Sequence, residues 1–126
     1  MEQVTLLKQD ETVRLDSDRL GELYAQLGEA GAEDVVCRAM EELAARLAYA
    51  ERMYRLGHHA DLRKSVRSLA AIADQVGMFT LARVARNVIG CVDTGDAIAL
   101  AATLARLLRI GERSLTAGWD LQDLSL

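Results

Sequence analysis

Proline is absent from the 126 residues, and aromatic side chains make up only 4% of them. Without proline the chain lacks the residue that breaks helix interiors most strongly. With so few rings, the core must be built from Leu, Val, Ile, Ala and Met, in a chain that is 51% hydrophobic. Ala, Leu, Arg and Glu are abundant and favour helix. We therefore expect one all-α domain.

Cysteine is scarce, and long apolar runs are missing. Cys37 and Cys91 are far apart and fit no metal-ligand spacing. Both lie in apolar surroundings, so we expect buried, reduced thiols and a reducing compartment. No apolar run approaches the roughly 20 residues of a membrane span, and residues 1–15 lack the pattern of a secretory signal. The sequence thus predicts a cytoplasmic location.

Strong charge of one sign is also missing, because the net charge is only −4. This balance argues against non-specific nucleic-acid binding, which requires a basic surface. The Glu-x-x-His pairs of di-metal bundles do not occur, and the glycines stand singly rather than in a phosphate loop. We expect no metal and no cofactor.

The most regular pattern lies between Leu62 and Gly77. Five apolar residues recur at steps of four and three and predict the buried stripe of a helix: Leu62, Val66, Leu69, Ala73 and Val76. Gly77 ends the helix, since glycine readily adopts positive φ. The opposite, exposed face is predicted to carry six residues: Arg63, Lys64, Arg67, Ala70, Ala71 and Asp74.

Further amphipathic segments flank this helix. We predict a short helix over 17–27, capped by Asp16 or Ser17, and longer helices over 32–56, 78–92 and 96–115, the last capped by Asp93 or Thr94. Residues 1–15 form an arm or a small hairpin, and residues 119–126 a tail whose Trp119 closes the end of the bundle. Short turns make neighbouring helices antiparallel. The expected fold is an up-down-up-down four-helix bundle over residues 16–118, with a short extra N-terminal helix.

The central helix and its glycine resemble the histidine-containing phosphotransfer (HPt) domain family. That family has the signature H-x-x-K-G-x-x-x-x-x-G on a four-helix bundle. Gly77 matches the last glycine, and Ala71 keeps the small size of the first. The resemblance covers about residues 32–115 and implies a role in two-component signalling.

Two positions depart from the signature. Arg67 stands where the family has its phosphoryl-accepting histidine, and Ala70 replaces the lysine. Arginine stays protonated and offers no lone pair for phosphoryl transfer. The resemblance then implies a degenerate, non-catalytic member that binds the receiver domain of a response regulator, or a sensor kinase. The partner-binding residues would be the six of the exposed face.

Two other functions stay open. In the first, the chain is a structural or oligomerisation domain, and apolar residues of its two ends pair between subunits: Val4, Leu6, Leu7, Leu121, Leu124 and Leu126. In the other, the chain is a phosphotransferase that uses His58 or His59 at a helix start, where the helix dipole favours a phosphoryl group. Transfer of label from a phosphorylated receiver distinguishes this second function from the rest.

Overall fold

The computed structural model describes residues 15–125, and the side chains of residues 15–120. All of its regular structure is helical: α2 (Ser17–Arg55), α3 (His59–Gln75), α4 (Phe79–Thr94) and α5 (Ala97–Ser125). The prediction of an all-α fold is confirmed. The predicted arm over residues 1–15 lies outside the described residues apart from Leu15.

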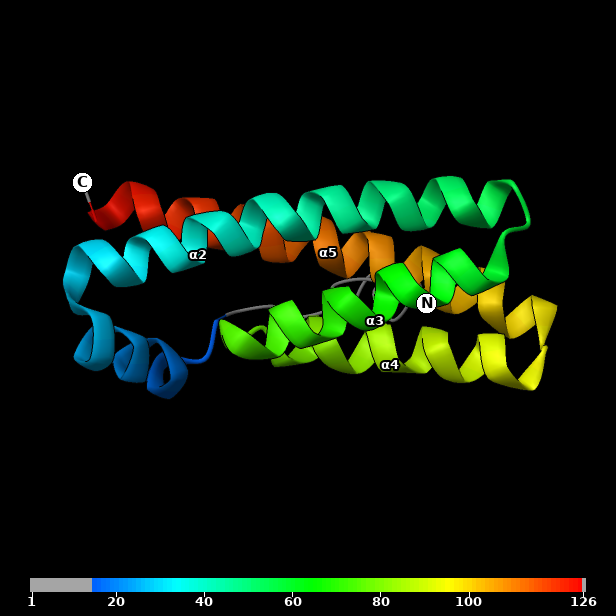
Figure 1. The fold of residues 1–126 in the computed structure, drawn as a ribbon, viewed down its shortest axis with the longest axis horizontal. Coiled ribbons are helices and arrows are strands. Elements are labelled where there is room, and N and C mark those ends of the chain that lie inside the picture. The colour runs from blue at the N-terminus through cyan, green and yellow to red at the C-terminus, as the bar shows by residue number, and fades with distance from the viewer. Residues whose placement is uncertain (1–14, 126) are drawn as a thin grey trace, which may run out of the picture.

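The four helices form a bundle in which each helix runs antiparallel to the one before it (Figure 1). α2 packs on α3, α3 on α4 and α4 on α5, and α5 returns against α2 to close the bundle. Gly57, Gly77 and Gly95 lie in the three turns with φ of 74°, 79° and 71°. These left-handed conformations suit glycine and let the chain reverse within a few residues.

α2 is bent near its start. Gly28, with φ 75° and ψ 173°, interrupts the helical backbone just after the short helix predicted over 17–27. The helix resumes directly after this bend, so the predicted short helix is the first segment of α2 rather than an additional element. The carboxylate of Asp16 caps this segment by accepting from the Arg19 amide at 2.8 Å. Arg19 Nε also donates to the carbonyl oxygen of Gln75 at 2.8 Å. The segment is therefore fastened to the end of α3, as its position in Figure 1 indicates.

The core is aliphatic, as predicted. Every residue of the predicted α3 stripe is fully buried: Leu62, Val66, Leu69, Ala73 and Val76. The facing residues of α2 recur at steps of four and three, and they too are buried: Val36, Met40, Leu43, Leu47 and Ala50. A seam of this period is what nearly antiparallel helices need in order to stay in contact along their length.

The end of the chain differs from the prediction. The last helix does not end near residue 115 but continues through Gly118 to Ser125, so residues 119–125 are helical rather than a tail. Trp119 is 45% exposed and does not close the bundle. Gly118 is buried because α5 approaches α2 closely there, and a Cβ atom would collide with Met40 Sδ. Gly111 makes a similar approach, with Leu47 Cδ1 2.5 Å from the position of a Cβ.

Two smaller predictions were also wrong. Asp96, not Asp93 or Thr94, caps α5 by accepting from the Ala99 amide at 3.0 Å. Ile98, near the start of α5, is 86% exposed because the buried arc of α5 begins at Leu100. Both cysteines were expected to be buried and are partly exposed. In the described part of the chain, no helix has the length and apolarity that crossing a membrane requires.

Candidate functional site

The outer face of α3 carries the candidate site. Arg67 is exposed at the middle of the helix, and Lys64 and Ala71 are exposed beside it. Ala70, predicted on the same face, is instead only 5% exposed and belongs to the core. The correction has a simple reason: α3 packs against both α2 and α4, so its buried arc is wider than the apolar stripe alone.

Two ion pairs tie α3 to α4 on either side of Arg67. The guanidinium of Arg63 binds Asp93 with both nitrogens, Nε to Oδ1 at 2.7 Å and Nη2 to Oδ2 at 3.0 Å. Three turns further along α3, Asp74 pairs with Arg86 of α4. Arg63 and Asp74 were predicted to face a partner, but their charged groups already have partners within the bundle.

Acid should weaken the first of these pairs. Hydrogen bonds from Arg63 lower the pKa of the Asp93 carboxyl below its ordinary value of 3.8. A carboxyl with a lower pKa in the folded state adds stability above its unfolded pKa and loses it as pH falls through the folded value. We therefore expect Arg63→Gln to reduce the stability lost on acidification below about pH 4. Urea unfolding of both proteins at pH 6 and pH 3 measures this, and equal losses would contradict it.

The two ion pairs frame an open patch between the helices. Because α3 and α4 are antiparallel, the residues between Arg63 and Asp74 lie across from those between Arg86 and Asp93. Gly90 is exposed there, and no atom lies within 4 Å of the position that its Cβ would occupy. Asn87 is exposed one turn away. Because Ala71 of α3 and Gly90 of α4 have small or absent side chains, few atoms project from the surface around Arg67.

On its other side, Arg67 borders a groove between α2 and α3. The groove is lined by Arg46, Tyr49, Asp61, Lys64, Ser65, Arg67 and Ser68. Its lining thus contains three cations and one carboxylate. Arg46 pairs with Glu42 at 3.2 Å. Within the described residues, Lys64 and Arg67 make no ion pair or hydrogen bond. Their charges are therefore available to a carboxylate or phosphate ligand.

The two histidines lie apart from this groove, at the start of α3. His58 precedes the helix and makes no side-chain capping hydrogen bond, and both residues are exposed. Among the described residues, no hydrogen bond or ion pair involves either ring. No three His, Cys, Asp or Glu side chains gather into a metal-binding cluster in the same part of the chain.

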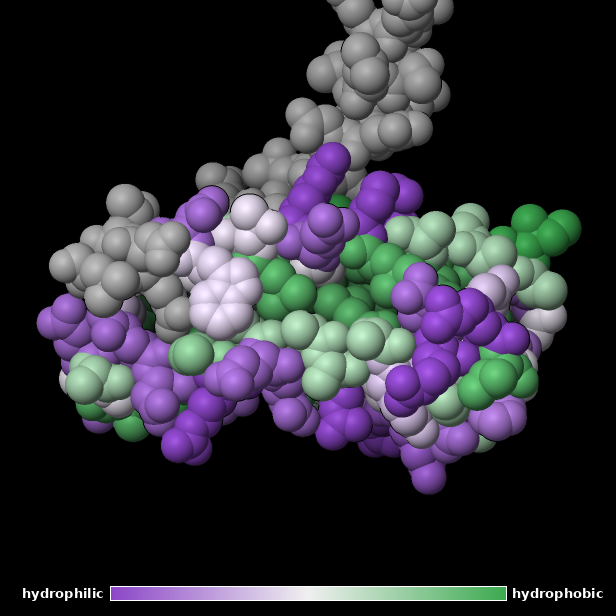
Figure 2. All heavy atoms as spheres, turned by 90° about the horizontal axis from the view of Figure 1, so that it is seen from above, coloured by the Kyte–Doolittle hydropathy of each residue, from purple (hydrophilic) through white to green (hydrophobic). Residues whose placement is uncertain are grey.

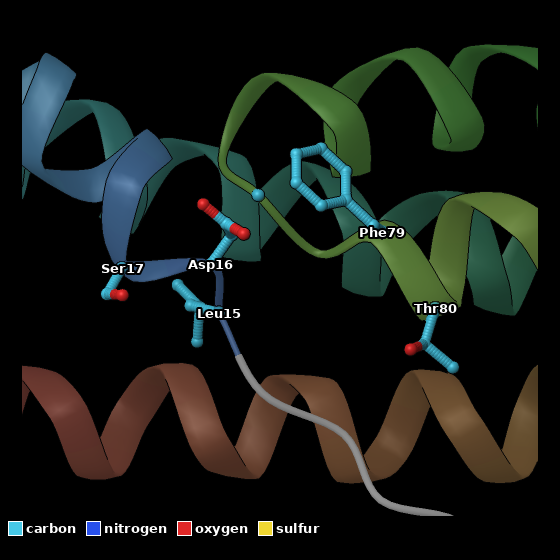
Figure 3. Close-up of a pocket in the computed structure, with 6 residues that line it drawn as sticks. Leu15, Asp16, Ser17, Phe79 and Thr80 are labelled. Carbon is cyan, nitrogen blue, oxygen red and sulfur yellow. The ribbon is translucent and has the colours of Figure 1, made fainter.

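A second hollow lies where α2 begins. Leu15, Asp16 and Ser17 line one side of it, and Phe79 and Thr80 of α4 line the other (Figure 3). The Asp16 amide donates to the carbonyl oxygen of Gly77 at 2.9 Å. Asp16 lies so close to Gly77 that a Cβ on residue 77 would be 3.1 Å from the Asp16 nitrogen. This close contact is a sufficient reason for glycine at position 77, and a bound ligand is not needed to explain it.

Sequence reasoning located Arg67 on the surface but missed its neighbours on α4. Gly90 carried a signal, since a glycine inside a helix costs stability and often has a packing or functional reason. Arg46 and Tyr49 gave none, because the groove depends on how α2 packs against α3. We compared the chain with protein-family models, curated proteins and solved structures, and none of these comparisons found a match.

Proposed function

We propose that this chain is a non-catalytic, HPt-like protein that binds the receiver domain of a response regulator, or its sensor kinase, as a regulator or decoy. The single observation that carries the proposal is the position of Arg67. Its side chain is exposed at the middle of α3, at the place where the HPt signature has histidine. A guanidinium there suits a partner whose own site is a cluster of carboxylates, because arginine binds carboxylate with two parallel hydrogen bonds.

The surroundings of Arg67 support contact with an acidic surface. Lys64 adds a second cation from the same face, and Arg46 contributes a third from α2. The low surface at Ala71 and Gly90 lets another protein approach the backbone closely. The Arg63–Asp93 and Arg86–Asp74 ion pairs hold the two helices that would form the docking surface.

Absence of catalysis is the second half of the proposal. Arginine remains protonated at neutral pH and cannot attack a phosphoryl group. Ala70, at the position of the family's lysine, is buried and offers no cation to an incoming phosphate. The chain would therefore occupy a receiver without removing its phosphoryl group.

We expect Arg67→Glu to weaken binding to the cognate receiver domain at least tenfold, which corresponds to about 1.4 kcal/mol or more. The reversal replaces attraction by repulsion between like charges. The measurement is calorimetric titration of a panel of isolated receiver domains and sensor-kinase domains, at two salt concentrations. Arg55→Glu is the matched control, because this substitution makes the same change of charge at the C-terminal end of α2. No binding to any member, or equal binding by both variants, would refute the docking proposal.

Label transfer tests the proposed lack of catalysis separately. A receiver domain phosphorylated with radioactive phosphate is mixed with the chain, and both bands are followed with time. We expect the label to stay on the receiver. Transfer to the chain would overturn this half of the proposal, and its loss in a His58→Gln, His59→Gln double variant would assign the acceptor to the start of α3.

A further inference from the structure

α5 carries a second apolar stripe that faces outward. Its members recur at steps of three and four, with Glu112 as the one charged position: Ile98, Ala101, Ala105, Leu108, Leu115 and Trp119. Ile98 is 86% and Trp119 45% exposed, while Leu108 and Leu115 are partly buried. The fully buried contacts of α5 within the bundle use other residues, among them Leu104, Leu107 and Gly111, and Leu108 and Leu115 pack only against the edge of the core. The outer stripe has the 3.5-residue period of a helix that packs on another helix.

α2 widens this stripe into a two-helix face. Gly111 meets Leu47 and Gly118 meets Met40, so the part of α2 between Met40 and Leu47 lies along the second half of α5. Ala44 and Ala48 are exposed at this part of α2. Seen from above, apolar side chains gather along the middle of the surface over α2 and α5, with polar side chains around them (Figure 2). We call this surface the α2/α5 face.

We propose that the α2/α5 face binds the same face of a second copy of this chain, with the two α5 helices antiparallel. The first argument is size. Ala101 and Ala105 of the stripe are small, Leu115 and Trp119 are large, and the two pairs lie equally far from residue 110. A two-fold axis near residue 110 sets Trp119 of each copy against Ala101 of the other, and Leu115 against Ala105. Large residues opposite small ones give the interlocking that a tight interface needs.

The second argument is area. The stripe spans three heptads, roughly 30 Å at 1.5 Å per residue. Two helices side by side are about 20 Å wide, so the face would bury roughly 600 Å² on each copy, or about 1,200 Å² in total. This area is at the lower limit for specific, stable complexes. The pairing is therefore expected to be concentration-dependent.

Dimerisation leaves the docking site open. Among the described residues, the backbones of α3 and α5 do not approach each other, so α3 lies diagonally across the bundle from α5. A dimer through the α2/α5 face would display the Arg67 surface of both copies to solvent. The pairing and the proposed receiver binding can therefore succeed or fail independently.

Sedimentation equilibrium of the full chain from 1 to 500 µM tests the pairing. We expect a monomer–dimer equilibrium, with the emission of Trp119, the single tryptophan, moving to shorter wavelength as the dimer forms. Ala105→Glu should weaken dimerisation at least tenfold. Because Ala105 is exposed, the circular dichroism of the variant, and its unfolding midpoint at concentrations where both proteins are monomers, should match the original chain. Ala60→Glu, at an exposed alanine in the first turn of α3, is the control and should dimerise normally.

Three results would overturn the proposal. The first is a monomer at every concentration, which would leave the face to a different protein. The second is a dimer that Ala105→Glu does not weaken, which would place the contact elsewhere. The third is dimerisation without any change in the emission of Trp119, because the proposed pairing buries that ring.

Discussion

Replacing Leu69 by alanine is expected to lower the free energy of unfolding by about 2–5 kcal/mol. Leu69 is fully buried at the middle of α3, in the helix that packs against both α2 and α4. Truncation removes apolar contacts and leaves a cavity, since close-packed helices relax only partly around it. A loss of this size is a large share of the 5–15 kcal/mol that stabilises a typical domain. Urea unfolding followed by circular dichroism at 222 nm measures it.

Leu56→Ala is the matched control for this substitution. Leu56 is 58% exposed in the turn after α2, so the same change in chemistry should cost less than about 0.5 kcal/mol. Comparable losses at Leu56 and Leu69 would mean that α3 is not central to the core. The assignment of Leu69 to the core and of Leu56 to the surface would then be wrong.

Gly118→Val should also destabilise the protein, by about 1–3 kcal/mol. The site is inside α5, where valine is at least as good a helix former as glycine. The expected loss therefore comes from packing alone. A Cβ at this position collides with Met40 Sδ, and Met40 is fully buried and has little room to move. The helices must separate locally or Met40 must adopt a poorer rotamer.

Gly21→Ala separates this packing effect from helix propensity. Gly21 is exposed in the first segment of α2, and nothing lies within 4 Å of the position of its Cβ. Alanine there should raise the free energy of unfolding by up to about 1 kcal/mol. The two changes should thus have opposite signs in thermal unfolding. A stabilising Gly118→Val would show that α5 does not approach α2 as closely as described.

The features that the sequence predicts well depend on neighbouring residues. The stripe from Leu62 to Val76 follows from a period of 3.6 residues, and Gly57 and Gly77 mark turns because a left-handed conformation suits glycine. Arg67 belongs to the same group. Once the stripe is assigned, its place on the outer surface follows from helical geometry.

The features that it misses depend on contacts between helices. Gly118 has the local appearance of a helix stop, and only the approach of Met40 from α2 explains its presence inside α5. Ala70 is equally suited to a surface or a core, and the packing of α3 against two neighbours decides for the core. The Arg63–Asp93 pair joins residues thirty positions apart, a separation that no local pattern specifies.

The hydroxyl of Ser65 restricts how far α3 can shift along α2. It is 2% exposed and donates to the carbonyl oxygen of Arg46 at 2.9 Å, linking α2 and α3 inside an otherwise aliphatic contact. Leucine and valine seams tolerate small translations, whereas a buried hydroxyl that loses its acceptor costs about 1–3 kcal/mol. A piston-like shift of α3 along α2 would break this bond. The spacing between Arg46 and Arg67, on opposite walls of the groove, should therefore stay constant when a partner pushes on either helix.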